Sequence, residues 1–418
     1  MNLRNDASTI IKDAIKSALP GNKVRELLFQ VDLGIGKVIV IAVGKAAHTM
    51  AKAAHDVLRS RIHAGLVITK EGTKVDEIPN MKVILAGHPH PNEKSYEAAE
   101  ESIKLVSDLT PDDHVLFLLS GGASALFEKP MISPESYQYI NDQLLACGAN
   151  INEINTIRKH LSYVKGGRFA EIAAPAKVDT ILLSDVLGND ISMVGSGPTT
   201  PDKTTGEEAF AIIEKYHIRI PADTIEVLMK ETPKVLKNVS YEVVGDISMM
   251  LRTAKSTCEM LGYDTVLLND NLTCEASEAG TFIAGIAKTF SGSKDNIAFL
   301  MGGETVVHLK GAGMGGRNQE MALSCAIGID GMENVCFFSV GSDGTDGPTN
   351  AAGGIVDGTT AKKIRKAGID PVKALQDNDS YHALKSVGSL VVTGATGTNV
   401  NDLSVLLIHR KDEEAVNE

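Results

Sequence analysis

The sequence predicts an α/β protein of two domains, each built on strands covered by helices. Short apolar runs that end in glycine or a polar turn alternate with amphipathic stretches along most of the chain. This alternation is typical of a parallel sheet with helices packed against it. The length of 418 residues exceeds what one ordinary hydrophobic core accommodates, so we expect two domains.

The first domain is expected to span residues 1–235. Apolar residues at helical spacing indicate an N-terminal helix, with Asp6 available as its cap. The continuous apolar run at 38–43 is typical of a strand buried on both faces. Further strands are expected at 65–69, 82–86, 114–119 and 180–184, and helices at 92–109, within 134–174 and within 206–230.

The second domain is expected to span residues 236–418, with the boundary in the polar connector ETPKVLKNVS, although its last segment could pack on the first domain. Strands are expected at 241–244, 265–268, 297–301, 305–309, 335–340, 390–393 and 403–408. Helices are expected up to residue 261 and at 275–290.

Composition excludes several classes of function. A net charge of −12, 4% aromatic residues and no tryptophan argue against a nucleic-acid surface. No apolar run approaches the ~20 residues that span a bilayer, and the N-terminus has no signal-peptide block. Five cysteines without a CxxC pair argue against structural zinc and a disulfide framework. We therefore expect a cytoplasmic protein that acts on small molecules and contacts no membrane.

Glycines cluster three times between residues 301 and 354, with charged residues beside them. Glycine lets backbone N–H groups approach an anion, and the guanidinium of Arg317 suits phosphate or carboxylate. Asp343 and Asp346 follow a predicted strand and suit a hydrated Mg²⁺. Together these residues indicate phosphoryl transfer.

Polar residues also follow the buried strands of the first domain, where open α/β sheets bind ligands. Lys45 stands where the strand at 38–43 turns into a helix, a position that favours anions. Asp185 follows another strand and could bind magnesium or accept a proton from a substrate hydroxyl. After the strand at 114–119, a small polar turn could hold phosphate: Ser120, Gly121, Gly122 and Ser124.

A basic cluster occupies residues 158–168. Such a cluster is usually a solvated helix face, and a single histidine such as His160 is more often structural than a base. The Lys-Gly-Gly-Arg run at its end is more typical of a turn that contacts an anion. We therefore treat Arg158, Lys165 and Arg168 as candidate phosphate or substrate ligands.

The sequence lacks one common nucleotide-binding motif and contains another. No GxxxxGK[ST] is present, which excludes a P-loop kinase. Gly311, Gly313 and Gly316 match the dinucleotide fingerprint GxGxxG. The preceding VVHLK alternates apolar and polar residues, unlike a doubly buried strand, and the following helix opens with polar residues. The motif leaves a NAD(P)-dependent reductase open as an alternative.

Nine stretches resemble, in order, the glycerate 2-kinase family, whose C-terminal portion is called the MOFRL domain. They are VGKAA (43–47), GHPHPNEKS (87–95), LLSGGASAL (118–126), NTIRKHLSYVKGGRFA (155–170), LLSDVLGND (182–190), GSGPTTPD (195–202), MGGETVVHLKGAGMGGRNQE (301–320), GSDGTDGPTNAAGG (341–354) and TGATGTNVNDL (393–403). The sequence departs from the family pattern at Asn92, Ala123, Asn189 and Ala395. Asn189 weakens any expectation of an anionic metal ligand there.

The resemblance implies a Rossmann-like parallel sheet with helices on both faces and a smaller C-terminal MOFRL-type α/β domain. It implies ATP-dependent phosphorylation of D-glycerate to 2-phosphoglycerate in a cleft between the domains, with ATP and Mg²⁺ as cofactors. By position it makes Lys45, Asp185, Arg317 and Asp343 the catalytic set.

In the mechanism we expect, Lys45 and Arg317 bind the transferring phosphoryl group or the glycerate carboxylate. Asp343 and Asp346 hold magnesium, and Asp185 orients or deprotonates the acceptor hydroxyl. The glycines expected to contact phosphate are Gly313, Gly315 and Gly316.

Three alternatives stay open at this point. They are a hydroxypyruvate reductase, a label that some family members have carried, a non-catalytic sugar-phosphate-binding regulator, and phosphorylation at the 3-hydroxyl. The sequence also leaves open which domain binds adenine and whether the protein forms a homodimer.

Overall fold

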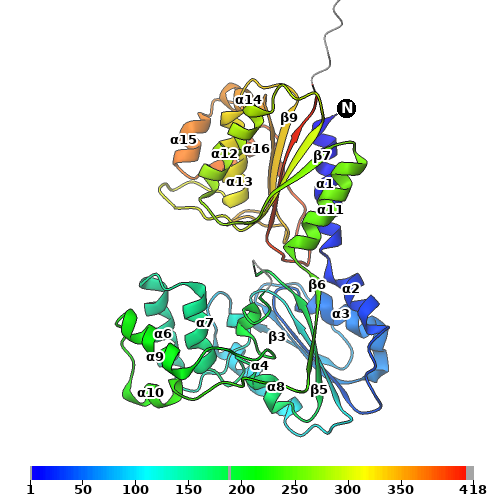
Figure 1. Ribbon diagram of the computed structural model, residues 1–418, viewed down its shortest axis with the longest axis vertical. Coiled ribbons are helices and arrows are strands. Elements are labelled where there is room, and N and C mark those ends of the chain that lie inside the picture. Colours follow the sequence, from blue (N-terminus) through cyan, green and yellow to red (C-terminus); the bar gives the residue numbers. More distant parts are fainter. Residues whose placement is uncertain (1, 187–189, 411–418) are drawn as a thin grey trace, which may run out of the picture. The chain divides into compact units, whose positions relative to one another are not determined.

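The computed structural model describes residues 2–186 and 190–410. It divides into two compact units (Figure 1), which we call the N-terminal unit and the C-terminal unit. The N-terminal unit is Pro20–Val244, and the C-terminal unit joins Met1–Leu19 to Gly245–Glu418. Each unit has its own sheet, so each is described separately.

The N-terminal unit contains a six-stranded sheet with the order β3-β2-β1-β4-β5-β6. Its strands are β1 (Val38–Val43), β2 (Ile62–Lys70), β3 (Met81–Ala86), β4 (His114–Leu119), β5 (Lys177–Leu183) and β6 (Val239–Gly245). The pairs β1–β2, β1–β4, β2–β3 and β4–β5 are parallel. This order is that of doubly wound folds, with its topological switch between β1 and β4.

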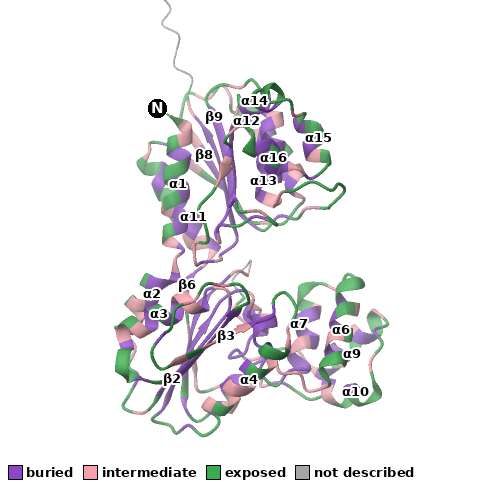
Figure 2. Ribbon diagram, turned by 180° about the vertical axis from the view of Figure 1, so that it is seen from behind, coloured by how far each residue is buried: buried purple, intermediate pink, exposed green. Residues whose placement is uncertain are grey.

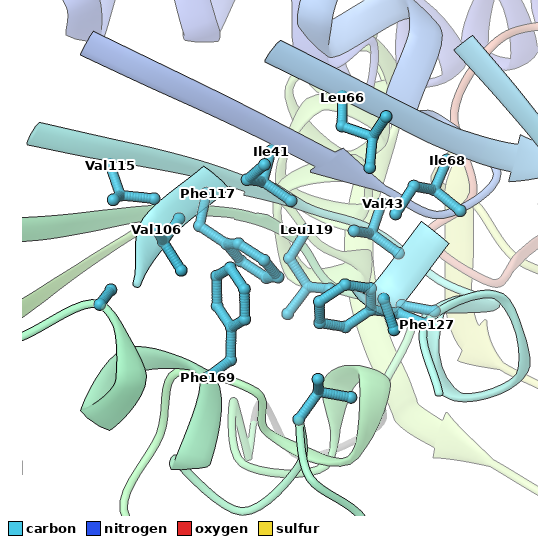
Figure 3. Close-up of a cluster of buried hydrophobic side chains, with 14 of the residues drawn as sticks. Ile41, Val43, Leu66, Ile68, Val106, Val115, Phe117, Leu119, Phe127 and Phe169 are labelled. Carbon is cyan, nitrogen blue, oxygen red and sulfur yellow. The ribbon is translucent and has the colours of Figure 1, made fainter. Parts of the chain in front are cut away.

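Helices cover both faces of this sheet. The helices α2 (Pro20–Leu28) and α3 (Ala47–Leu58) lie on one side (Figure 1). On the other side, α4 (Glu93–Val106), α5 (Ala123–Leu126) and α8 (Arg168–Ile172) contribute to the main core. Phe117, Phe127 and Phe169 pack together there, with ring centroids 5.1–5.9 Å apart (Figure 3). Every residue of β1 and β4 is buried, as their continuous apolar runs predict.

A second, all-helical core lies beside the sheet in the same unit. It is formed by α6 (Pro134–Ala146), α7 (Ile151–His160), α9 (Gly206–Lys215) and α10 (Ala222–Leu228) (Figure 1). Short 3₁₀ turns occur at Arg59–Arg61 and Val194–Ser196.

The C-terminal unit contains a mixed sheet with the order β11-β10-β9-β12-β8-β7. Its strands are β7 (Asp264–Leu272), β8 (Ile297–Gly303), β9 (Val335–Gly341), β10 (Gly353–Asp357), β11 (Leu390–Val391) and β12 (Asp402–Ile408). The pair β7–β8 is parallel, whereas β12 runs antiparallel between β8 and β9. The first residue of β12, Asp402, therefore lies opposite Gly303 and Gly341, where β8 and β9 end.

Two groups of helices enclose this sheet, and its central strands β8, β9 and β12 are buried between them (Figure 2). The helices α1 (Leu3–Ser17) and α11 (Ile247–Met260) lie on one face. The other face carries α12 (Ala276–Thr289), α13 (Arg317–Gly328), α14 (Thr360–Lys366), α15 (Pro371–Gln376) and α16 (Ser380–Lys385).

The unit boundaries differ from the expected division at 235/236. The first helix belongs to the C-terminal unit, because Tyr263 donates a hydrogen bond to the buried Asp6 (Oη to Oδ2, 2.8 Å). Asn2 caps that helix in place of Asp6. Strand β6, expected to open the second domain, instead joins the first sheet, where Val178 N donates to Asn238 O (2.7 Å). A domain boundary drawn from local composition takes no account of contacts between segments that are far apart in the chain.

The other predicted strands of the two sheets are present, apart from the one at 305–309. This prediction was wrong, because that segment forms only an isolated bridge between Glu275 and Val306. Strand β10 and the helices α14–α16 were not predicted. In the part of the chain that the structure describes, no helix is long and apolar enough to cross a membrane.

Candidate active site

Two neighbouring turns at the switch point of the N-terminal sheet bring together two of the candidate residues, Lys45 and Ser120. Lys45 N donates to Gly121 O (2.9 Å), and Ala46 N donates to Ser120 Oγ (3.1 Å). The turns approach so closely that a Cβ on Gly44 would lie 2.2 Å from Ser120 Oγ, and Gly44 has a φ of 121°. Glycine is therefore required at this turn.

The half-buried Lys45 forms no ion pair with the residues that the structure describes. Gly122, in the left-handed region with a φ of 85°, packs between Lys45 and His88, since a Cβ there would lie 3.2–3.3 Å from both side chains. Burial and the positive charge of Lys45 lower the pKa of His88 to about 4, so this imidazole is neutral near pH 7. The prediction missed His88, although it follows β3 at the same carboxyl edge.

A cavity of about 380 Å³ opens beside Gly122 in the N-terminal unit. Its polar lining comes from three segments: the loop after β3, the turn after β4, and the facing sides of α6 and α7. Those residues are His88, His90, Gly122, Ser124, Tyr137, Gln138, Asn141 and Arg158. Two of the predicted site residues after β4 and one of the predicted cations thus share one cavity.

Lys165 was predicted to contact an anion, and this prediction was wrong. Its side chain is fully buried, and Nζ donates to Ser124 O and Phe127 O, both at 2.9 Å. Glu128 Oε2 lies 3.4 Å away and supplies the opposite charge. Lys165 therefore ties down the turn that carries Ser124 and leaves no donor for a substrate.

Arg168 was also wrongly predicted as an anion ligand. One terminal nitrogen donates to Lys159 O (2.6 Å) and Ser162 O (3.2 Å), and the other points to the carbonyls of Lys230 and Glu231. The guanidinium is buried and bonded by main-chain carbonyls, so it joins chain segments.

Asp185 lies two residues beyond β5 and is partly buried, on the edge of the sheet that also carries Lys45. Its role towards a substrate hydroxyl stays a prediction. Asn189 lies outside the described residues.

In the C-terminal unit, Arg317 is the first residue of α13 and makes a branched ion pair. Its Nε and Nη2 donate to the two carboxylate oxygens of Asp402 (2.5 and 3.1 Å), and Nη1 lies 3.0 Å from Glu304 Oε1. Asp402 is buried, whereas half of the Glu304 side chain is exposed. The pair with Asp402 therefore fixes the guanidinium, and the pair with Glu304 is the one a ligand could replace.

Burial raises the pKa of Asp402 to about 6, and the charge of Arg317 opposes that shift. Burial lowers the pKa of Arg317, but the bonds to Asp402 outweigh it and the pKa is raised, so the guanidinium stays charged. The prediction missed Asp402 because its place depends on β12 inserting between β8 and β9.

The expectation that Asp343 and Asp346 together hold a metal ion is contradicted for Asp346. Its Oδ1 accepts from Asn318 N (3.2 Å), and its Oδ2 accepts from Gln319 N (2.8 Å) and Gln319 Nε2 (3.0 Å). This buried carboxylate caps the first turn of α13. Among the described residues, no group of three or more acidic, histidine or cysteine side chains could hold a metal.

Asp343 is partly exposed, and its Oδ1 accepts from the backbone and hydroxyl of Thr345 (2.9 and 3.0 Å). It keeps one oxygen without a bond from the described residues, so one carboxylate of the predicted pair remains available for a ligand.

The loop with the GxGxxG pattern packs against another segment of the protein, residues 377–380. Gly313 N donates to Asp377 O (2.9 Å), and Gly311 N donates to the side chain of Asn378 (3.0 Å). A Cβ on Gly315 would lie 2.2 Å from Ser380 Oγ. A Cβ on Gly316 would lie 2.3 Å from the carboxyl carbon of Asp346. These glycines allow close packing, and the prediction that the Gly313 backbone binds phosphate was wrong.

Comparison with known proteins agrees with this architecture. Residues 6–229 match the family described as a domain of unknown function, DUF4147, and residues 297–402 match the MOFRL family. A D-glycerate 2-kinase from Thermotoga maritima is 48% identical, over 97% of this chain and 99% of the relative. A protein of Agrobacterium vitis with the provisional name hydroxypyruvate reductase is 40% identical, over 90% of this chain and all of the relative.

A crystal structure of glycerate kinase from Thermotoga maritima superposes with a TM-score of 0.92 at 47% identity, over 97% of this chain and 99% of that one. The likeness spans both units and includes the DUF4147 and MOFRL regions in order. The chain therefore belongs to the glycerate 2-kinase family of enzymes.

Proposed function

We propose that this enzyme catalyses ATP-dependent phosphorylation of D-glycerate to 2-phosphoglycerate. The observation that carries the proposal is Lys45, a cation without an acidic partner among the described residues, held in a turn that is bonded to Gly121 at the switch point of the sheet. Family membership supplies the substrate class, since the relative that is 48% identical is named a D-glycerate 2-kinase.

In phosphoryl transfer, positioning and charge neutralisation supply most of the rate enhancement. Lys45 binds and neutralises the transferring group, and the turn at Ser120–Gly122 sets its position. Arg317 contributes a second cation when an oxyanion replaces Glu304, while Asp402 continues to hold the guanidinium.

Asp185 orients the acceptor hydroxyl and takes its proton as the phosphoryl group arrives. ATP supplies the phosphoryl group when bound. If Lys45 or Arg317 binds both the glycerate carboxylate and that phosphoryl group, the two anions lie close together. This geometry favours the 2-hydroxyl over the 3-hydroxyl.

Magnesium fits the site through one carboxylate. Asp343 is partly exposed with one uncommitted oxygen, and one or two carboxylates with phosphate oxygens are the usual ligands of this ion. In the proposal Asp343 would be the one protein carboxylate that holds Mg²⁺, and the bound ion would neutralise phosphate charge. The cytoplasmic location and the homodimer considered from the sequence stay predictions.

The reductase alternative receives one supporting observation, the provisional name of the 40% identical relative. The geometry disfavours it, because the backbone N–H groups of Gly311 and Gly313, which a pyrophosphate would need, are bonded to Asn378 and Asp377.

A coupled assay separates these functions. We expect release of ADP that depends on both D-glycerate and ATP, and no change in NAD(P)H absorbance with hydroxypyruvate. Lys45→Ala should lower turnover by roughly 10²-fold or more, as removal of a transition-state cation or donor does, with Lys52→Ala, an exposed lysine on α3, as the matched control. Oxidation of NAD(P)H without ADP release would refute the proposal.

A further inference from the structure

The cavity beside Gly122 is lined by a cation that has no acidic partner among the described residues. Arg158 of α7 is partly buried and lines it. Its Nε donates to Asn141 Oδ1 (2.7 Å), whereas its two terminal nitrogens form no hydrogen bond or ion pair with any residue that the structure describes. Partial burial of a charge is unfavourable unless a partner compensates it. These nitrogens therefore present a fork of donors to the cavity.

The guanidinium is held in place from behind. Asn141 is buried, and its Nδ2 donates to the main-chain carbonyl of Tyr137 (2.8 Å). This bond fixes which way the amide points, so Asn141 Oδ1 faces Arg158. Asn141 therefore orients the guanidinium and leaves its two terminal nitrogens available for a ligand. Binding sites generally need their charged groups to be held in place in this way.

Charges around the cavity also favour an anion. None of the described residues that line it is acidic. The nearby carboxylate of Glu128 is buried, where it accepts from Tyr137 Oη (2.5 Å) and faces Lys165. Lys45 packs against Gly122, which lines the cavity. A volume of about 380 Å³ lies within the range of about 300–1,000 Å³ that small-molecule sites have.

We propose that Arg158 and its supporting Asn141 form a binding site for one oxyanion, a carboxylate or a phosphate, which the guanidinium holds in a bidentate manner. This inference rests on the proposed function, because glycerate supplies the first kind of anion and the nucleotide supplies the second. The site makes Arg158 a specificity-determining residue for whichever substrate carries the anion.

Calorimetric titration of D-glycerate, ADP and inorganic phosphate, each separately, tests the inference on the full chain. Arg158→Gln should weaken binding of at least one of them roughly 10-fold or more, because charged hydrogen bonds contribute strongly to affinity. Arg158→Lys should recover little of it, since an ammonium cannot form the fork. Arg61→Gln removes the same charge from an exposed site of the same unit and should change nothing.

The ligand whose affinity falls identifies the source of the anion. Unchanged affinity for all three in folded Arg158→Gln overturns the inference, and Arg158→Lys decides in the same way if the glutamine variant fails to fold. Turnover is measured in the same wild-type preparation. If the wild-type protein releases no ADP in response to glycerate while Arg158→Gln still loses anion affinity, the proposed function is rejected and the anion site is retained.

Discussion

Replacement of Lys165 with methionine tests whether this lysine stabilises the fold or binds a substrate. The side chain has no exposed surface, and its ammonium bonds to the carbonyls of Ser124 and Phe127 and faces Glu128. Methionine fills similar space but donates nothing. The variant leaves Glu128 buried without its counter-charge, although Tyr137 and Ser162 still donate to that carboxylate.

Removal of one partner from a buried ion pair destabilises a protein by about 3–5 kcal/mol. We expect a loss of that size in the free energy of unfolding of the N-terminal unit. Lys165→Met combined with Glu128→Gln removes both charges. This pair should lose less than the sum of the single variants, with a coupling energy above about 1 kcal/mol.

Urea unfolding followed by circular dichroism measures these losses. Lys129→Met is the matched control, because Lys129 follows Glu128 in sequence but its ion pair with Glu100 is partly exposed to solvent. The loss in this variant should stay below about 1 kcal/mol. In folded Lys165→Met, the affinity for ADP and glycerate should stay within a few-fold of wild type. A stable variant with strongly weakened ligand affinity would refute the reasoning and restore Lys165 as an anion ligand.

Four further predictions concern His88 beside Lys45 in the N-terminal unit and Asp346 and Arg317 in the C-terminal unit. In NMR titrations His88 should remain neutral down to about pH 4, and Lys45→Ala should raise its pKa towards 6.5, while an unshifted pKa would show that the two side chains do not interact. Because the folded-state pKa of His88 lies below its unfolded value, its contribution to stability should fall as the pH drops from 6.5 to about 4, and His88→Gln should flatten that part of the urea-unfolding profile. Asp346→Ala should lower the free energy of unfolding by about 1–2 kcal/mol through loss of the α13 cap, but keep the same Mg²⁺ dependence of turnover; a large rise in the Mg²⁺ requirement would make Asp346 a metal ligand after all. Arg317→Ala should fold and lose roughly 10²-fold in turnover, and near-normal turnover would remove this residue from the mechanism.

The part of the site that sequence reasoning predicted is the part governed by local rules. Lys45 and Ser120 follow buried strands, and the carboxyl ends of adjacent parallel strands meet at one edge. The same rule, applied to β3, would also have indicated His88. The positions of β1 and β4 followed from continuous apolar runs, because a strand buried on both faces tolerates little else.

The residues that were wrongly predicted depend on contacts between distant segments. Lys165 and Arg168 look like an anion-binding turn in sequence, yet main-chain carbonyls and Glu128 occupy their donors. Asp346 looks like a metal ligand until α13 is placed with its first turn on that carboxylate. Asp402 could be recognised only after β12 was known to lie between β8 and β9.

The glycine loop shows the same limit in another form. A pattern of glycines indicates that another group approaches the backbone closely, but it does not identify that group. In this protein the approaching group is the segment that carries Asp377 and Asn378. A nucleotide phosphate would have required the same sequence.

The central claim, glycerate 2-kinase activity, is tested most directly by the identity of the product. Purified protein is incubated with ATP, Mg²⁺ and D-glycerate, and the product is followed by phosphorus NMR and by direct conversion with enolase. We predict 2-phosphoglycerate, which enolase converts without a mutase, and no phosphorylated product when glycerate is left out. A product that enolase accepts only after mutase is added would place the phosphoryl group on the 3-hydroxyl and contradict the account.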